Sequence, residues 1–260
     1  FALPAGGTGA SELSGITYAG GNQYYAVSDE NHTVYPLSIS VNSTTGAITG
    51  AALSSGIVLS TGSDLEGIAY DSATGSIYVS DESGPAIRRH SLADGSLLGT
   101  VAVPAIYGNI RSNLSLESLT RGAGAMWTAN EEALSVDGPV STLSAGTIVR
   151  LQKYNAAGAA VGQWAYITDP IPGPVLSGMG DRSGVSDLVA LPDGRLLVLE
   201  RGLGGNGFTP YIRSAIYFCD RHQRHSKPLH RLLQPGLQNA ALAAQRLSKL
   251  RGYYPWADAR

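Results

Sequence analysis

DLEGIAYDSATGSIYVSDES, residues 64–83, reads as a short apolar strand, a tight turn and a second strand that ends in acids. Its DSATG turn supplies the small and polar residues that a hairpin between two strands needs. Three other segments repeat this unit, over residues 12–30, 115–132 and 184–202. Because self-similarity at a fixed period identifies repeat architectures, this unit dominates the interpretation of the chain.

The four copies are spaced like the blades of a propeller. Asp29 and Asp81 are 52 positions apart, Asp81 and Asn130 are 49, and Asn130 and Glu200 are 70, so the last interval holds an insertion. Further strands follow each pair. We expect third strands at 33–39, 86–92, 147–154 and 215–218, and fourth strands at 56–60, 97–103 and 161–167. Four antiparallel strands per repeat predict an all-β fold, a β-propeller with about four blades present.

Composition excludes several other classes of protein. The 260 residues are 43% hydrophobic and 15% charged, which does not describe a disordered chain. No run of residues approaches the roughly 18 consecutive apolar residues of a membrane-spanning helix, so we expect no membrane span. One cysteine excludes a disulfide framework and a multi-cysteine metal cluster.

Acidic residues recur where the chain enters the first strand of a repeat and leaves the second. In an antiparallel meander these two points lie at the same end of the blade, so pseudo-symmetry gathers them around the mouth of the central channel. The first group is Glu66, Glu117 and Asp187. The second group is Asp29, Glu30, Asp81, Glu82, Asn130, Glu131 and Glu200.

The negative charges of carboxylates that converge in this way must be offset by protons, by water or by a bound cation. Two of them ~5 Å apart repel by about 3 kcal/mol at an effective dielectric constant near 20. Oxygen ligands suit Ca²⁺ or another hard divalent cation rather than zinc. We therefore predict metal ligands at Asp29, Asp81, Glu82, Asn130, Glu131 and Asp187, and catalytic carboxylates at Glu66, Glu117 and Glu200. The competing interpretation is that strand-end acids only accept hydrogen bonds from loop N–H groups.

Two arginines in long connections on the acidic face are candidate substrate-binding groups. Guanidinium groups match the oxygens of phosphate in pairs, and Arg111 and Arg182 are the best placed of the arginines in the repeats. The alternative for each is a solvated surface arginine.

The combined strings LSGITY…YAVSDEN, LEGIAYD…IYVSDES, LSLESLT…WTANEE and GVSDLVALPDGRLLVLERG resemble the phytase-like family described as having esterase-like activity, over about residues 3–218. Glu66 and Glu117 match the Leu-Glu strand openings of that family, and Asp29, Asp81 and Glu200 match its acidic strand ends. Ser14 stands where later repeats have Glu, so the first repeat departs from the pattern.

The resemblance implies a propeller of the six-bladed type, extracellular or periplasmic, that hydrolyses phosphate or carboxylate esters. A small-molecule ester or phosphoester is then the partner, with no nucleic acid bound by the propeller. Two alternatives stay open: a lactonase of the gluconolactonase type, and a non-catalytic extracellular binding propeller with structural Ca²⁺. We expect a monomer, prone to aggregation if the propeller is incomplete.

The charge of the chain reverses near its end. Residues 1–210 carry 9 Lys and Arg against 18 Asp and Glu, whereas residues 211–260 carry 9 Lys and Arg against 2 Asp and Glu.

We divide the chain into an incomplete propeller, 1–218, and an anomalous basic tail, 219–260, in which only 237–251 suggests a helix. With permitted codons, KLRGYYPWADA shifted by one base becomes SYEGITLGQM, another strand opening. We therefore expect the tail to be out of frame and the chain truncated; a genuine polyanion-binding tail is the alternative.

The string GLGGNG at 202–207 matches a dinucleotide fingerprint formally, but no helical pattern follows it. We expect a flexible loop there.

Overall fold

Each repeat forms one sheet of consecutive antiparallel strands. The computed structural model describes residues 9–173, 181–206, 209–219, 228–230 and 254–255. Blade 1 contains β1 (Leu13–Gly20), β2 (Gln23–Ser28), β3 (Thr33–Val41), β4 (Ile48–Leu53) and β5 (Ile57–Val58). Blade 2 contains β6 (Leu65–Asp71), β7 (Ser76–Asp81), β8 (Ala86–Ser91) and β9 (Leu97–Val101).

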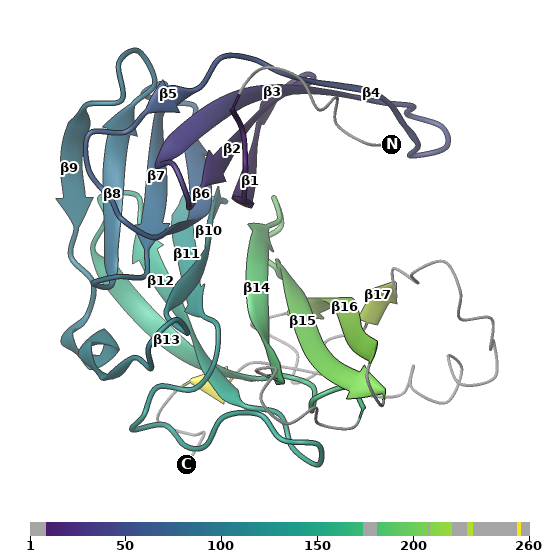
Figure 1. The fold of residues 1–260 in the computed structure, drawn as a ribbon. Coiled ribbons are helices and arrows are strands. Elements are labelled where there is room, and N and C mark those ends of the chain that lie inside the picture. The colour runs from purple at the N-terminus through teal and green to yellow at the C-terminus, as the bar shows by residue number, and fades with distance from the viewer. Residues whose placement is uncertain (1–8, 174–180, 207–208, 220–227, 231–253, 256–260) are drawn as a thin grey trace.

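Blades 3 and 4 follow after the short helix η1 (Ala105–Asn109). Blade 3 contains β10 (Leu116–Gly122), β11 (Ala125–Asn130), β12 (Ile148–Asn155), β13 (Ala160–Ile167) and the short β18 (Tyr254–Pro255). Blade 4 contains β14 (Arg182–Ala190), β15 (Leu196–Asn206), β16 (Thr209–Cys219) and the short β17 (Pro228–His230). The prediction of an all-β propeller with four blades is confirmed. In Figure 1 the blades follow one another around an arc, with blades 1 and 4 at its two ends.

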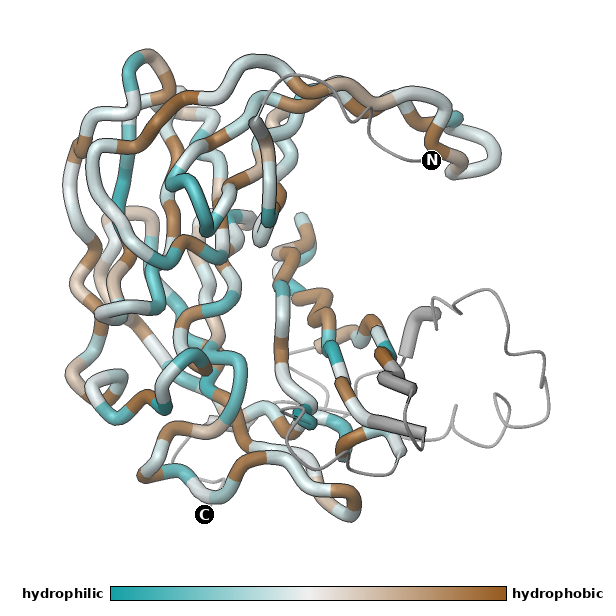
Figure 2. Tube along the Cα trace, in the orientation of Figure 1, coloured by the Kyte–Doolittle hydropathy of each residue, from teal (hydrophilic) through white to brown (hydrophobic). Residues whose placement is uncertain are grey.

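The first strands of successive blades, β1, β6, β10 and β14, lie next to one another along the inside of this arc. Apolar and polar residues alternate along the strands (Figure 2), so each blade has apolar side chains to bury against its neighbours. Three apolar clusters fill the contacts between blades 1 and 2, 2 and 3, and 3 and 4. The hydrophobic core therefore consists of three equivalent contacts, one between each pair of neighbouring blades.

Each inner strand carries a β-bulge near its start. The pairing register shifts between Leu13 and Gly15 in β1, and at the equivalent places in β6, β10 and β14. A bulge inserts an extra residue and redirects its side chain. The residues at these four bulges include Ser14, Glu66, Glu117 and Ser186, so the repeated bulge places Glu66 and Glu117 at equivalent positions.

Two predicted segments differ from the structure. The main fourth strand of blade 1 is β4, not 56–60, because the Asn42 side chain accepts hydrogen bonds from the amides of Thr44 and Thr45 and closes a tight turn after β3. The short β5 pairs with the other end of β3.

The GLGGNG segment is not a loop: through Asn206 it continues β15 and pairs with β16. A Cβ at Gly202 would lie 2.7 Å from Cδ of Pro172, so close packing accounts for a glycine there.

Of the basic tail, the structure describes Cys219, which ends β16, and the short strands β17 and β18, which pair with β16 and β13. The helix expected at 237–251 lies outside the described residues. Within the part of the chain that the structure describes, no helix is long and apolar enough to span a membrane.

Candidate active site

Strand register aligns the ends of the second strands across the blades. Leu13, Leu65, Leu116 and Val185 are equivalent residues at the bulges, and their pairing partners are Ser28, Asp81, Asn130 and Glu200. The next residue along each chain segment is Asp29, Glu82, Glu131 or Arg201. Because neighbouring residues of a strand point to opposite faces, the acids expected at one rim divide into two sets.

The side chains of the first set accept hydrogen bonds from backbone amide groups. Asp81 accepts hydrogen bonds from the amides of Ser63 at 3.2 Å and Ser83 at 3.0 Å, and forms an ion pair with Arg88. The side-chain oxygen of Asn130 accepts from the amide of Arg150 at 2.9 Å.

Glu200 is fully buried as well, and it accepts hydrogen bonds from the amide of Asp169 at 2.7 Å and from the hydroxyl of Tyr166. Asp81 and Asn130 were predicted to bind metal and Glu200 to be catalytic, and in the structure each of them is hydrogen-bonded to groups of the protein.

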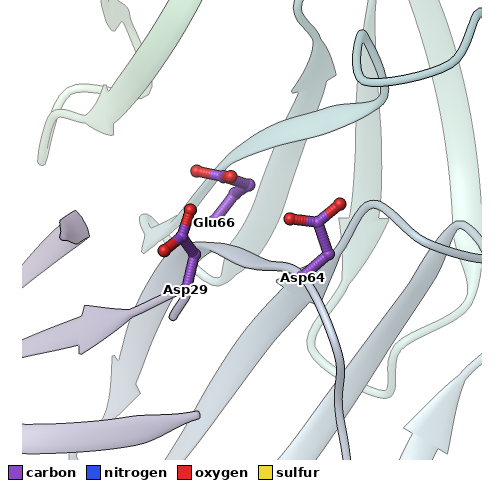
Figure 3. A group of neighbouring side chains, drawn as sticks. All are labelled: Asp29, Asp64 and Glu66. Atoms are coloured by element: carbon purple, nitrogen blue, oxygen red, sulfur yellow. The ribbon is translucent and has the colours of Figure 1, made fainter. Parts of the chain in front are cut away.

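The second set meets the bulge residues in one group, which we call the acid cluster: Asp29, Asp64, Glu66, Glu82, Glu117 and Glu131. Carboxylate oxygens of Asp29, Asp64 and Glu66 lie within 4.8 Å of one another (Figure 3), and so do those of Glu66, Glu82 and Glu117. Glu66 belongs to both groups. Asp64, the residue before β6, is the first residue of the repeat copy in blade 2, but it was not predicted as a site residue from the sequence.

Burial and mutual repulsion make it difficult to ionise these carboxyl groups together. Burial, together with the neighbouring carboxylates, raises the pKa of Glu117 to about 9 and that of Glu66 to about 8. Burial also raises the pKa of Glu82 to about 7, although the Ser115 amide opposes this by donating a hydrogen bond at 2.6 Å. The pKa of Asp64 is raised by burial and by Asp29 and Asp81.

Two arginines of blade 4 face the acid cluster. Arg201 lies where the other blades carry Asp29, Glu82 and Glu131, and its guanidinium is 3.4 Å from Oε1 of Glu117 and 3.3 Å from Oε1 of Glu131. Arg182, expected to bind substrate, lies 3.4 Å from Oε2 of Glu131. Arg201 was not predicted from the sequence, because the repeated acids point to Glu200, one position earlier, as the end of the strand.

Two other predicted residues lie outside the acid cluster. Arg111 donates hydrogen bonds to the carbonyl oxygens of Ala133 at 3.1 Å and Gly138 at 2.9 Å, so it fastens the connection after β11. Asp187 follows the bulge residue Ser186 and is equivalent to Gly15, Gly67 and Ser118. Its carboxylate accepts a hydrogen bond from the Leu188 amide, and burial raises its pKa to about 7.

The acid cluster fits a hard divalent cation by the chemistry of its donors, which are all oxygens. Oδ1 of Asp29 is buried and has no hydrogen-bond partner among the described residues. Buried polar atoms are otherwise almost always paired, so this oxygen has a free coordination position.

The raised pKa values give the first testable prediction. Folded Glu66, Glu82 and Glu117 hold protons up to pH values of about 8, 7 and 9, whereas the usual Glu pKa is 4.5. The stability from this difference is fully present below about pH 4.5 and is lost as pH rises through about 7 to 9. With chelator present, calorimetry should show Tm falling across that range, and Ca²⁺ should reduce the fall. A Tm in chelator that is independent of pH from about 6 to 9 would contradict this interpretation.

Comparison with known proteins identifies a family. The family model described as "Phytase-like: Esterase-like activity of phytase" matches residues 8–222. Comparison with curated protein sequences gives no match.

Solved structures similar to the chain include a streptogramin B lyase, with 13% identity, a TM-score of 0.41, and coverage of 84% of this chain and 65% of that one. Hydrazine synthase of Kuenenia stuttgartiensis has 12% identity, a TM-score of 0.42, and coverage of 84% and 66%. A chain of the nidogen/laminin complex has 10% identity, a TM-score of 0.44, and coverage of 93% and 83%. The chain thus spans just under two thirds of the length of the first two.

Proposed function

The chain belongs to the phytase-like family, and from this premise we propose that it hydrolyses phosphate or carboxylate esters at the acid cluster. One observation carries the proposal: carboxylates from blades 1, 2 and 3 converge on a place that two guanidinium groups of blade 4 also reach. A purely structural role does not account for this arrangement, because the carboxylates of the cluster raise one another's pKa values.

The residues that would hold a divalent cation such as Ca²⁺ are Asp29, Asp64 and Glu66, or Glu66, Glu82 and Glu117. Such an ion, when bound, neutralises the charge of a phosphate or polarises the carbonyl of an ester. Arg201 is half exposed and only loosely paired, so it can reach oxygens that become negative during the reaction. We assign proton transfer to Glu117, whose side chain is only 10% exposed. Its raised pKa lies close enough to neutral pH for exchange with water.

The experiment is an activity assay of the chain with a phosphomonoester, an aryl ester and a lactone, each with Ca²⁺ or with chelator. We expect the phosphomonoester or the aryl ester to be hydrolysed with Ca²⁺, and the rate to fall by about 100-fold or more in chelator. Hydrolysis of the lactone alone would favour a lactonase. Stabilisation by Ca²⁺ without turnover of any substrate would identify a non-catalytic binding propeller and reject the proposal.

A further inference from the structure

Ser115 is a buried serine beside the acid cluster, and the fold makes no use of its hydroxyl group. The side chain is fully buried, and its Oγ has no hydrogen-bond partner among the described residues. Buried hydroxyl groups are almost always paired, so an unpaired one needs an explanation. The Ser115 amide donates a hydrogen bond to Oε1 of Glu82 at 2.6 Å, and the Ser115 carbonyl oxygen accepts one from the amide of Glu117 at 3.0 Å. Ser115 is therefore held between two members of the acid cluster.

The blade repeat places Ser115 at the position of Asp64. The carbonyl oxygen of Asp64 accepts a hydrogen bond from the amide of Glu82 at 2.8 Å, and that of Ser115 accepts one from the amide of Glu131 at the same distance. Each residue directly precedes the inner strand of its blade, β6 or β10. Equivalent backbone positions direct their side chains alike, and the carboxylate of Asp64 lies in the acid cluster (Figure 3). The hydroxyl of Ser115 is thus directed at the acid cluster one blade further on.

Two equivalent groups of side-chain oxygens result. The first group is Asp29, Asp64 and Glu66, and the second, one blade further on, is Glu82, Ser115 and Glu117. Carboxylate oxygens of the first group lie within 4.8 Å of one another, and an oxygen of Glu66 is also within 4.8 Å of those of Glu82 and Glu117. Each group can therefore supply three oxygens to a cation, and Glu66 can contact both cations.

We propose that the acid cluster binds two hard divalent cations, and that Ser115 is a ligand of the second. The inference deepens the proposed function, because it rests on the cation binding assigned there. Serine and threonine hydroxyl groups bind Mg²⁺ in phosphate-binding loops, so a hydroxyl is a suitable ligand for such an ion. Two cations side by side can hold both the attacking and the leaving oxygen of a hydrolysis. The second site has one negative charge fewer than the first, because a serine replaces the aspartate, so it binds its cation more weakly.

The arrangement is not repeated in blade 4. Gly184 stands at the position of Ser115, and a Cβ there would lie 2.6 Å from the carbonyl oxygen of Glu131. Glu131 itself forms ion pairs with Arg182 and Arg201. A third cation would therefore lack the ligand at position 184 and would meet two guanidinium groups, so the repeat supplies two cation sites among the described residues.

Isothermal titration calorimetry with Ca²⁺ tests the proposal on the chain after treatment with chelator. The wild-type chain should bind two Ca²⁺ ions, in a tighter and a weaker step. Ser115→Ala should weaken the weaker step about tenfold or more and leave the tighter step unchanged. Ser115→Asp should tighten the weaker step about tenfold or more, because it gives the second site the ligands of the first. Asp64→Ser is the reciprocal variant and should weaken the tighter step.

Ser80→Ala is the matched control. Ser80 is as buried as Ser115, but its hydroxyl accepts a hydrogen bond from the Gly67 amide at 2.7 Å, and it lies outside the acid cluster. The variant should lose stability and bind both ions like the wild type.

The outcomes that overturn the proposal are separate from those that reject the proposed function. Binding of a single Ca²⁺ overturns it, and ester hydrolysis that needs this one ion would leave the proposed function intact. Two ions that bind equally well to the wild type, Ser115→Ala and Ser115→Asp would remove Ser115 from the site. Two ions bound as expected, without hydrolysis of any ester, would reject the proposed function and retain both sites. If Ser115→Asp does not fold, as judged by circular dichroism, Asp64→Ser tests the same equivalence from the first site.

Discussion

Glu66→Gln is expected to lower kcat/KM for the best ester or phosphoester substrate by about 100-fold or more, while it raises Tm in chelator. Glu66 is shared by both groups of carboxylates, so its replacement removes one oxygen ligand from each. The folded chain must also keep Glu66 protonated up to about pH 8, which costs stability above the usual Glu pKa of 4.5, and Gln carries no such cost. Kinetics with Ca²⁺ and calorimetry in chelator give the two measurements.

The opposite signs of these effects distinguish a site residue from a structural one. A residue that only supports the fold loses activity and stability together, whereas a residue held in an unfavourable cluster gains stability when it is neutralised. Glu30→Gln is the control, since Glu30 follows Asp29 and is exposed, and it lies outside the acid cluster. Unchanged kcat/KM in Glu66→Gln, or a lower Tm in chelator, would remove Glu66 from the proposed site.

The repeat predicted the blades because each copy carries its own strand pattern and turn. DLEGIAY and IYVSDES became β6 and β7 nearly at the expected bounds. The fourth strand of blade 1 was predicted at the wrong segment because two segments, β4 and β5, both pair with β3. The turn that Asn42 closes leads the chain from β3 directly into the longer of them, β4.

The site was predicted in its location but only partly in its members. Glu66, Glu82, Glu117, Glu131 and Asp29 were expected at this end of the blades, and the structure brings them together. The sequence alignment paired Asp29 with Asp81, whereas the strand register pairs it with Glu82. A shift of one residue turns a side chain from the cluster to the loop backbone, because strand side chains alternate. The bulge that sets this register leaves no clear mark in the sequence.

Arg201 shows a second limit of the pattern. Three blades carry an acid at its position and the fourth carries a base, so a search for repeated acids misses it. Its role depends on neighbours from blade 3, Glu117 and Glu131, which are 84 and 70 residues away in sequence. This contact forms because the blades are arranged around a common centre, and the spacing of residues along the chain does not predict it.

The second large effect is expected from Asp137→Asn, which should lower the free energy of unfolding by about 3–5 kcal/mol and Tm by roughly 10 °C. Asp137 and Arg150 form a two-point ion pair with both nitrogen–oxygen distances at 2.6 Å, and their side chains are only 1% and 3% exposed. Removing one partner leaves the other charge buried with less compensation. Denaturant unfolding of the variant and of the wild type measures the difference.

Asp193→Asn is the matched control. The ion pair between Asp193 and Arg195 is equally short, at 2.7 Å, but both side chains are largely exposed, so its loss should leave stability unchanged. The double variant Asp137→Leu with Arg150→Met should lie closer to the wild type than either single variant does. Replacing a buried ion pair by apolar groups removes both desolvation penalties at once.

The position of this pair links its stability to the acid cluster. Asp137 lies in the connection after β11 that begins with Glu131, and Arg111 fastens the same connection through the carbonyls of Ala133 and Gly138. If the ion pair holds Glu131 toward Arg201, Asp137→Asn should lower kcat/KM even at temperatures where the variant is fully folded. If activity per folded molecule is unchanged, the pair stabilises blade 3 alone, and Glu131 is positioned by the Val185 amide that donates to its carbonyl oxygen.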